Sequence, residues 1–283
     1  MYRLLIALTA LAVASAAAAQ DLTGTLKKIR DSKTITLGYR DNSVPFSFTG
    51  PDKNPDGYTV DLCKRVVASL QRQLNLPDIQ VRWVQVTAES RIPAVTKGEI
   101  DLECGTTTAT LGRQEQVDFS NLTFVDGGGF LIRSDTKIAG MGGLAGKKIA
   151  VTTGTTTEKQ LRDVLKERLV NAEVVTVKSG MEALAALEAG RIDAYANDRF
   201  VLVGLATQAK DPKSLMLLEE DFSFEPYALM MRRDPAFRLA VNRALSQIYG
   251  SGAIVEIYDR WFGQIGKPGV LLAAMYYLNA VPE

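Results

Sequence analysis

The 283-residue sequence has no histidine, few cysteines and almost no net charge, and each scarcity excludes some functions. Without histidine there can be no His-based catalytic triad, no imidazole proton shuttle and no imidazole metal site. A catalytic thiol is also disfavoured, because no histidine exists to activate it. The net charge of +1 removes the case for broad nucleic-acid binding, which requires a basic face. Nothing in the sequence indicates a metal or a cofactor.

Long hydrophobic runs are scarce too. The apolar run at residues 4–13 follows the single charge of Arg3 and leads into small residues that end at Ala19. This order is typical of a secretory signal peptide, and the run is shorter than the roughly 18–20 residues that span a membrane. We therefore predict a signal peptide at residues 1–19 and a periplasmic location, without a lipid anchor because no cysteine directly follows the cleavage site. The late apolar run at residues 270–278 is also short, and we expect it to pack on the core.

The only cysteines are Cys63 and Cys104. After export a disulfide between them is chemically allowed. Two buried free thiols fit the sequence as well, so both alternatives stay open.

The composition is that of a globular protein, with 46% apolar and 23% charged residues. Residues 33–38 form a β-rich run that ends at a glycine, and residues 79–84 alternate like a second strand. Between them, residues 58–70 place Val60, Cys63, Val67 and Leu70 at helical spacing. Strands that alternate with helices predict an α/β fold with parallel sheets, and the length favours two lobes over one core.

A short internal repeat suggests that the two lobes are built alike. Residues 94–102 resemble residues 186–194, because in both a helical pattern stops at a glycine and an Ile-Asp pair opens a strand. The consecutive glycines at residues 127–129 can absorb backbone rotation and predict a hinge, with a tight turn as the alternative. A second crossing is expected near residues 224–227, and ligands of such folds bind in the cleft between the lobes. The predicted organisation is a first lobe of residues 20–127 and 226–283 and a second lobe of residues 128–225.

Three stretches supply groups that could hold a charged small molecule. Arg113 follows the threonine-rich residues 106–110, and its planar guanidinium could pair with a carboxylate, although a surface arginine on a capped helix is the alternative. Residues 152–158 form a Gly-Thr loop before a helix start, which suits anion binding but lacks the ending of a phosphate-binding loop. Asp198 follows a predicted strand and could accept an ammonium group, with a helix N-cap as the alternative. Together these groups suit a zwitterionic amino acid.

Ordered matches along the chain resemble a known family. They include residues 38–47, 57–62, 90–93, 103–108, 113–114, 118–120 and 153–158. Over about residues 26–262 the sequence resembles the type 3 periplasmic amino-acid-binding proteins of ABC transporters, especially the glutamate/aspartate-binding proteins of Gram-negative bacteria. The resemblance implies a two-lobed, type II periplasmic-binding-protein-like α/β fold with two crossover hinge strands and a central cleft. It also implies a monomeric receptor that is not an enzyme, uses no cofactor and delivers its amino acid to an inner-membrane permease.

The resemblance assigns roles to five residues of the expected cleft. Arg113 would clamp the α-carboxylate of the ligand, assisted by Thr108. Asp198 would accept the α-ammonium group, with Thr106 beside it. Thr156 would contribute a hydroxyl from the second lobe.

Two further arginines bear on which amino acid is bound. Arg40 and Arg91 hold the places of the arginines that bind the side-chain carboxylate in the glutamate/aspartate receptors. Two departures weaken this assignment, because Gly180 stands where those receptors have a histidine and Ala88 where they have a serine. Two cations in a cleft without an anion are electrostatically costly, so we still expect glutamate or aspartate. The alternative is that one or both arginines pair with a protein carboxylate such as Glu103.

Two other kinds of function compete with that of a transport receptor. An enzyme on the same fold, similar to cyclohexadienyl dehydratase, would require a cleft carboxyl group with an elevated pKa and turnover of a cyclic acid. The sensor lobe of a signalling receptor is disfavoured, because no transmembrane segment follows the signal peptide.

Overall fold

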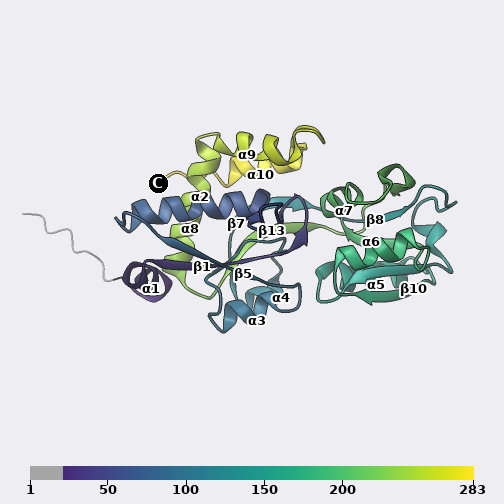
Figure 1. The fold of residues 1–283 in the computed structure, drawn as a ribbon, viewed down its shortest axis with the longest axis horizontal. Coiled ribbons are helices and arrows are strands. Elements are labelled where there is room, and N and C mark those ends of the chain that lie inside the picture. The colour runs from purple at the N-terminus through teal and green to yellow at the C-terminus, as the bar shows by residue number, and fades with distance from the viewer. Residues whose placement is uncertain (1–21) are drawn as a thin grey trace, which may run out of the picture.

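The computed structural model describes residues 22–283, so the predicted signal peptide lies outside the described residues. The chain forms two lobes side by side, each built on a five-stranded sheet (Figure 1). The strand order is β5-β1-β6-β13-β7 in the first sheet, which defines lobe 1, and β10-β9-β11-β8-β12 in the second, which defines lobe 2. The α/β architecture predicted from the sequence is confirmed.

Lobe 1 contains both ends of the described chain. Its sheet consists of β1 (Thr34–Tyr39), β5 (Gln80–Gln85), β6 (Leu102–Glu103), β7 (Asp118–Asp126) and β13 (Glu225–Met231). A small three-stranded sheet is formed by β2 (Asn42–Ser43), β3 (Ser47–Thr49) and β4 (Pro55–Asp56). The helices are α1 (Gly24–Ser32), α2 (Tyr58–Gln73), α3 (Arg91–Thr96), α4 (Leu111–Gln114), α8 (Pro235–Gly250), α9 (Ala253–Phe262) and α10 (Val270–Leu278).

Lobe 2 is continuous in sequence. Its strands are β8 (Gly128–Arg133), β9 (Lys148–Thr152), β10 (Glu173–Val177), β11 (Ala194–Asp198) and β12 (Leu215–Leu217). Its helices are α5 (Thr156–Glu167), α6 (Gly180–Glu188) and α7 (Arg199–Ala206), with short 3-10 turns η1 (Met141–Leu144) and η2 (Pro212–Ser214).

The local predictions largely agree with the structure. The predicted helix is α2, in which Val60, Cys63, Val67 and Leu70 are buried. The second predicted strand is β5, but it is mostly exposed because it lies at the edge of its sheet. The sheets are also mixed rather than wholly parallel: β13 and β7 run antiparallel in lobe 1, as β8 and β12 do in lobe 2.

Each sheet is covered by apolar residues on both faces. Successive side chains of a strand point to opposite faces. Along β13, Leu229 and Met231 therefore join one core cluster and Ala228 and Met230 the other. Burial of such apolar surface, at about 25 cal/mol per Å², provides most of the favourable folding free energy.

The apolar run near the C-terminus packs on lobe 1 as α10, where Leu272, Met275 and Tyr276 are buried. The hydroxyl of Tyr276 is 2.8 Å from that of Tyr58 on α2. Within residues 22–283 no helix has the length and apolarity needed to cross a bilayer.

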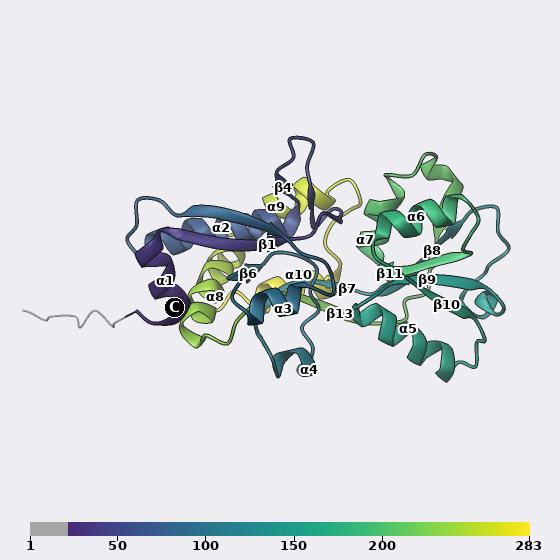
Figure 2. The ribbon, with the colours of Figure 1, turned by 60° about the horizontal axis from the view of Figure 1, so that its bottom comes forward.

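Two adjacent strands connect the lobes, β7 leading into β8 and β13 returning the chain (Figure 2). At this crossing Asp126 pairs with Glu225 in register. Gly127 lies between β7 and β8, and Gly128 and Gly129 belong to β8, so these glycines form no tight turn. A Cβ on Gly128 would lie 2.5 Å from Ser223 Oγ and 2.8 Å from Cζ of Phe222, so a larger residue would have to displace these side chains.

Candidate functional site

A cleft between the lobes collects six of the seven ligand-binding residues expected from the sequence. It lies where parallel strands end and helices begin, the usual position of ligands in α/β folds. The side lined by lobe 1 consists of Arg40, Asn42, Ser43, Arg91, Thr106 and Thr108. The side lined by lobe 2 consists of Thr152, Thr155, Thr156, Thr157, Gly180, Asn197, Asp198, Val201 and Leu205.

The lobe 1 wall contains two buried guanidinium groups. Arg40 follows β1 and Arg91 begins α3, and they are 7% and 2% exposed. Arg91 Nη1 donates to the carbonyl of Thr106 at 3.1 Å, whereas the Nε atoms of both arginines have no hydrogen-bond partner among the described residues. Burial, and then the neighbouring charge of Arg91, lower the pKa of Arg40 to about 10, so Arg40 remains cationic at neutral pH.

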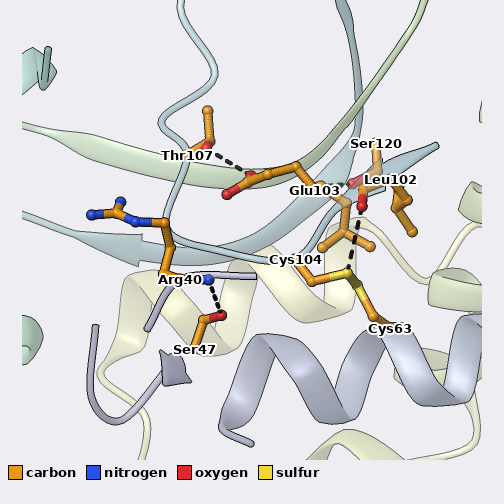
Figure 3. The surroundings of a disulfide bond; sticks show 9 residues. Arg40, Ser47, Cys63, Leu102, Glu103, Cys104, Thr107 and Ser120 are labelled. Carbon is orange, nitrogen blue, oxygen red and sulfur yellow. Dashed lines mark hydrogen bonds between the residues drawn. A yellow bond between two sulfur atoms is a disulfide. The ribbon is translucent and has the colours of Figure 1, made fainter. Parts of the chain in front are cut away.

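Glu103 does not neutralise these arginines through a direct ion pair. Its Oε2 accepts a hydrogen bond from Thr107 Oγ1 at 2.7 Å, and its Oε1 has no partner within the described part of the chain. Figure 3 shows Glu103 directed toward Thr107, with the side chain of Arg40 nearby. Among residues 22–283, the ion pairs involve neither Arg40 nor Arg91.

Arg113 is the predicted site residue that does not line the cleft. It lies on the short helix α4, is half-buried, and its Nη1 donates to the carbonyl of Thr108 at 2.8 Å. Burial and the charge of Arg91 lower the pKa of Arg113 to about 10, while Glu225 acts in the opposite direction. Arg113 therefore lies within electrostatic range of the cleft, with its guanidinium bonded to the backbone of Thr108.

Asp198 supplies a carboxylate from lobe 2. It ends β11 and accepts hydrogen bonds from Thr157 Oγ1 at 2.8 Å and from the hydroxyl of Tyr227. Burial, and then the charge of Glu225, raise the pKa of Asp198 to about 6. Its side chain does not cap α7. That function falls to Asp126, which accepts from the backbone N–H of Phe200 at 3.1 Å.

Glu225, at the start of β13, is a fully buried carboxylate that the sequence reasoning missed. Its Oε2 accepts from Thr108 Oγ1 of lobe 1 at 2.5 Å and from Thr156 Oγ1 of lobe 2 at 2.7 Å. Its Oε1 accepts from Ser223 Oγ at 2.9 Å and Gln160 Nε2 at 3.1 Å. The two lobes are thus joined through one carboxylate on the crossing strand.

The lobes are in direct contact around the cleft. The hydroxyl oxygens of Thr108 and Thr156 are 3.2 Å apart across it. Gly204 of α7 lies so close to lobe 1 that a Cβ there would be 2.3 Å from the carbonyl oxygen of Val44. Phe200, also on α7, packs edge-on against Phe124 of lobe 1, with ring centroids 5.1 Å apart. This arrangement is a closed one.

A disulfide joins Cys63 of α2 to Cys104, which directly follows β6 (Figure 3). Of the two alternatives that the sequence left open, the structure has the bridge, with a Cα–Cα distance of 6.2 Å. The next residues in the chain include Thr106 and Thr108 of the cleft. The bridge therefore anchors the threonine segment of the lobe 1 wall to the buried face of α2.

The two-lobed architecture with an interlobe cleft is that of the periplasmic amino-acid-binding proteins. Residues 35–264 match the bacterial extracellular solute-binding proteins, family 3, and the chain belongs to that family.

Two relatives whose names state a ligand match this chain over most of its length. It is 39% identical over 260 residues to an L-glutamate/L-aspartate-binding protein of Pseudomonas aeruginosa, covering 91% of this chain and 86% of that protein. It is 34% identical over 239 residues to the glutamate/aspartate import solute-binding protein of Escherichia coli, covering 84% and 79%. Among solved structures, an ancestral amino-acid-binding protein described as a precursor of cyclohexadienyl dehydratase is 29% identical, with a TM-score of 0.74. That match covers 84% of this chain and 100% of the other.

Proposed function

We propose that this solute-binding protein captures glutamate or aspartate in the periplasm and delivers it to the permease of an ABC transporter. The observation that carries the ligand assignment is the pair Arg40 and Arg91, which are buried in the cleft wall without an anionic partner among the described residues. Buried charges are normally paired, so a ligand carboxylate is the group that this wall lacks.

The other groups suit the two ends of an amino acid. Thr108 lines the cleft and Arg113 lies beside its backbone. We expect the two to hold the α-carboxylate, Arg113 through the donors that its bond to the Thr108 carbonyl leaves free. Asp198 would accept the α-ammonium group beside Thr106, and Thr156 would add contacts from lobe 2. Domain closure would follow, because a ligand that contacts both walls stabilises the closed form by those differential contacts.

The experiment is calorimetric binding by the refolded, ligand-stripped protein with glutamate, aspartate, glutamine, asparagine and a basic amino acid. We expect tight binding of the two acidic ligands alone. Arg40→Gln and Arg91→Gln should each weaken them by about 10- to 100-fold, since a hydrogen bond to a charged group contributes roughly 1.5–3 kcal/mol. Arg30→Gln, on the exposed side of α1, is the control and should bind normally. Tight binding of a neutral or basic amino acid in place of glutamate would refute the acidic ligand.

An enzymatic function on the same fold is the second candidate. It is favoured by the cleft carboxyl of Asp198, whose pKa burial raises to about 6, and by the likeness to a precursor of a dehydratase. Incubation with cyclohexadienyl acids tests it, and we expect no product. Turnover that is lost in Asp198→Asn would replace the transport proposal.

A further inference from the structure

We infer that two buried hydroxyls of lobe 2, those of Tyr195 and Thr152, present a fixed hydrogen-bond donor to the side-chain carboxylate of the ligand. Through this donor the site would select an acidic amino acid over its amide. The inference rests on the proposed function and adds a specificity element that the sequence reasoning did not find.

The two hydroxyls come from the neighbouring strands β9 and β11. Tyr195 on β11 is 0% exposed and Thr152 at the end of β9 is 4% exposed. Thr152 lines the same cleft as Arg40 and Arg91. The hydroxyl of Tyr195 lies 3.6 Å from the point where a Cβ on Gly180 would stand, and Gly180 lines the cleft as well.

Asn197 determines how this hydroxyl pair is protonated. The backbone N–H of Asp198 donates to Asn197 at 2.8 Å, and because it can only donate, the facing amide atom is Oδ1. The other amide atom, Nδ2, then faces the hydroxyl of Tyr195 at 2.6 Å and donates to it. The amide of Asn197 therefore cannot accept the proton of Tyr195.

A count of protons leaves one donor unused. The oxygens of Tyr195 and Thr152 are 2.8 Å apart, so one of their two hydroxyl protons lies between them. Burial raises the pKa of Tyr195 to about 12, so its proton is present at neutral pH. The second proton has no acceptor among the described residues, whichever hydroxyl carries it. Because Thr152 lines the cleft, a ligand atom there can accept it.

A carboxylate satisfies this arrangement better than an amide. A side-chain carboxylate placed among Arg40, Arg91 and Thr152 meets donors only. An amide would turn its NH₂ group toward a guanidinium or toward the hydroxyl pair, leaving a buried donor unpaired, which is costly. The hydroxyl pair lies beside Gly180, so it would supply a donor where the resemblance leads one to expect a histidine.

Thr152→Val and Tyr195→Phe test the inference when glutamate and glutamine affinities are measured side by side by calorimetry. Thr152→Val removes the donor but keeps the shape, so glutamate binding should weaken by about 10- to 100-fold and glutamine binding by much less. Tyr195→Phe frees the hydroxyl of Thr152 to rotate and accept. The ratio of glutamate to glutamine affinity should then fall by about tenfold, with a smaller loss for glutamate itself.

Three further variants separate this role from a structural one. Thr152→Ser keeps a hydroxyl and should restore the ratio. Thr207→Val, at the end of α7, and Tyr249→Phe, in the lobe 1 core, each lose a hydrogen bond to a carbonyl and should leave the ratio unchanged. An equal loss for both ligands, or an unchanged ratio in Thr152→Val, would overturn the inference while leaving the proposed function intact. A wild-type protein that binds neither acidic amino acid would overturn both.

Discussion

The two lobes share one strand plan. The second strand in the order is β1 in lobe 1 and β9 in lobe 2, and each lies between two strands parallel to it. The remaining two strands of each sheet adjoin the segments that cross between the lobes. The internal repeat also plays the same structural role in both lobes, because its aspartate accepts a backbone hydrogen bond from a neighbouring strand. Asp101 accepts a hydrogen bond from the backbone N–H of Thr36 at 2.8 Å, and Asp193 accepts one from that of Lys148 at the same distance.

The lobes differ in what they present to the cleft. Lobe 1 contributes Arg40 and Arg91, whereas the residues with which lobe 2 lines the cleft include four threonines and no arginine or lysine, with Asp198 as the acid. Lobe 1 also holds the disulfide and its neighbouring threonine segment. The shared plan thus fixes where strand ends lie, and the side chains at those ends give one wall its cations and the other its acid.

The largest expected effect tests whether the lobes are independently stable. Replacing both cysteines, Cys63→Ala with Cys104→Ala, opens a link across 41 residues and should lower the free energy of unfolding of lobe 1 by about 4 kcal/mol. Hydrogen exchange should show faster opening of β1 and β6, with β9 and β11 unchanged. Equal acceleration in both sheets would mean that the lobes unfold as one unit.

The next effect concerns the carboxylate that joins the lobes. Glu225→Met fills a similar volume but leaves Thr108, Thr156 and Gln160 without their acceptor, which should cost the closed form about 3 kcal/mol. Ligand affinity should fall accordingly, and small-angle scattering should report a more open ligand-free protein. Glu219→Met, on the exposed segment before the crossing, is the control. Unchanged affinity in Glu225→Met would show that the lobes close without this group.

A smaller effect is expected at the contact between α7 and lobe 1. Gly204→Ala should favour the helix itself but clash with the carbonyl of Val44, which costs the closed form about 2 kcal/mol. Thermal unfolding of the ligand-free protein should therefore be little changed while affinity for the ligand falls. Gly112→Ala, where an added Cβ meets nothing within 4 Å, should change neither. Normal affinity in Gly204→Ala would argue against a closed form as tight as this one.

The smallest effect is a pH dependence that comes from lobe 2. Asp198 has a raised pKa of about 6 in the ligand-free protein, so its protonated form is favoured below that pH. A ligand ammonium requires the ionised form, so binding releases a proton and affinity is lost as pH falls through 6. We expect about a tenfold weaker affinity at pH 5 than at pH 7, or about 1.4 kcal/mol. Calorimetry in buffers of different ionisation enthalpy would detect the proton, and its absence would place the ammonium elsewhere.

Features that depend on near neighbours in the chain could be read from the sequence. The helix at residues 58–70 follows from the spacing of its apolar residues, and Asp198 and Thr156 could be placed because each adjoins a strand or helix end. The exposure of β5 could not be predicted from the sequence, because the residues of a strand do not show whether it will lie at the edge or in the middle of its sheet. Glu225 was overlooked for a similar reason: its partners come from both lobes and meet only when β13 lies beside β7.

By itself the sequence determined the family, the α/β class and the side chains that strand ends would carry, because periodicity, caps and ordered motifs are local properties. Only the tertiary structure decided which of those side chains face one another. It left Arg40 and Arg91 without an ion-pair partner among residues 22–283, directed Arg113 to the backbone of Thr108, and brought Tyr195 and Thr152 together beside Gly180. The physical reason is that hydrogen-bond partners and burial depend on segments that are distant in sequence, and these meet only when two lobes close on a shared cleft.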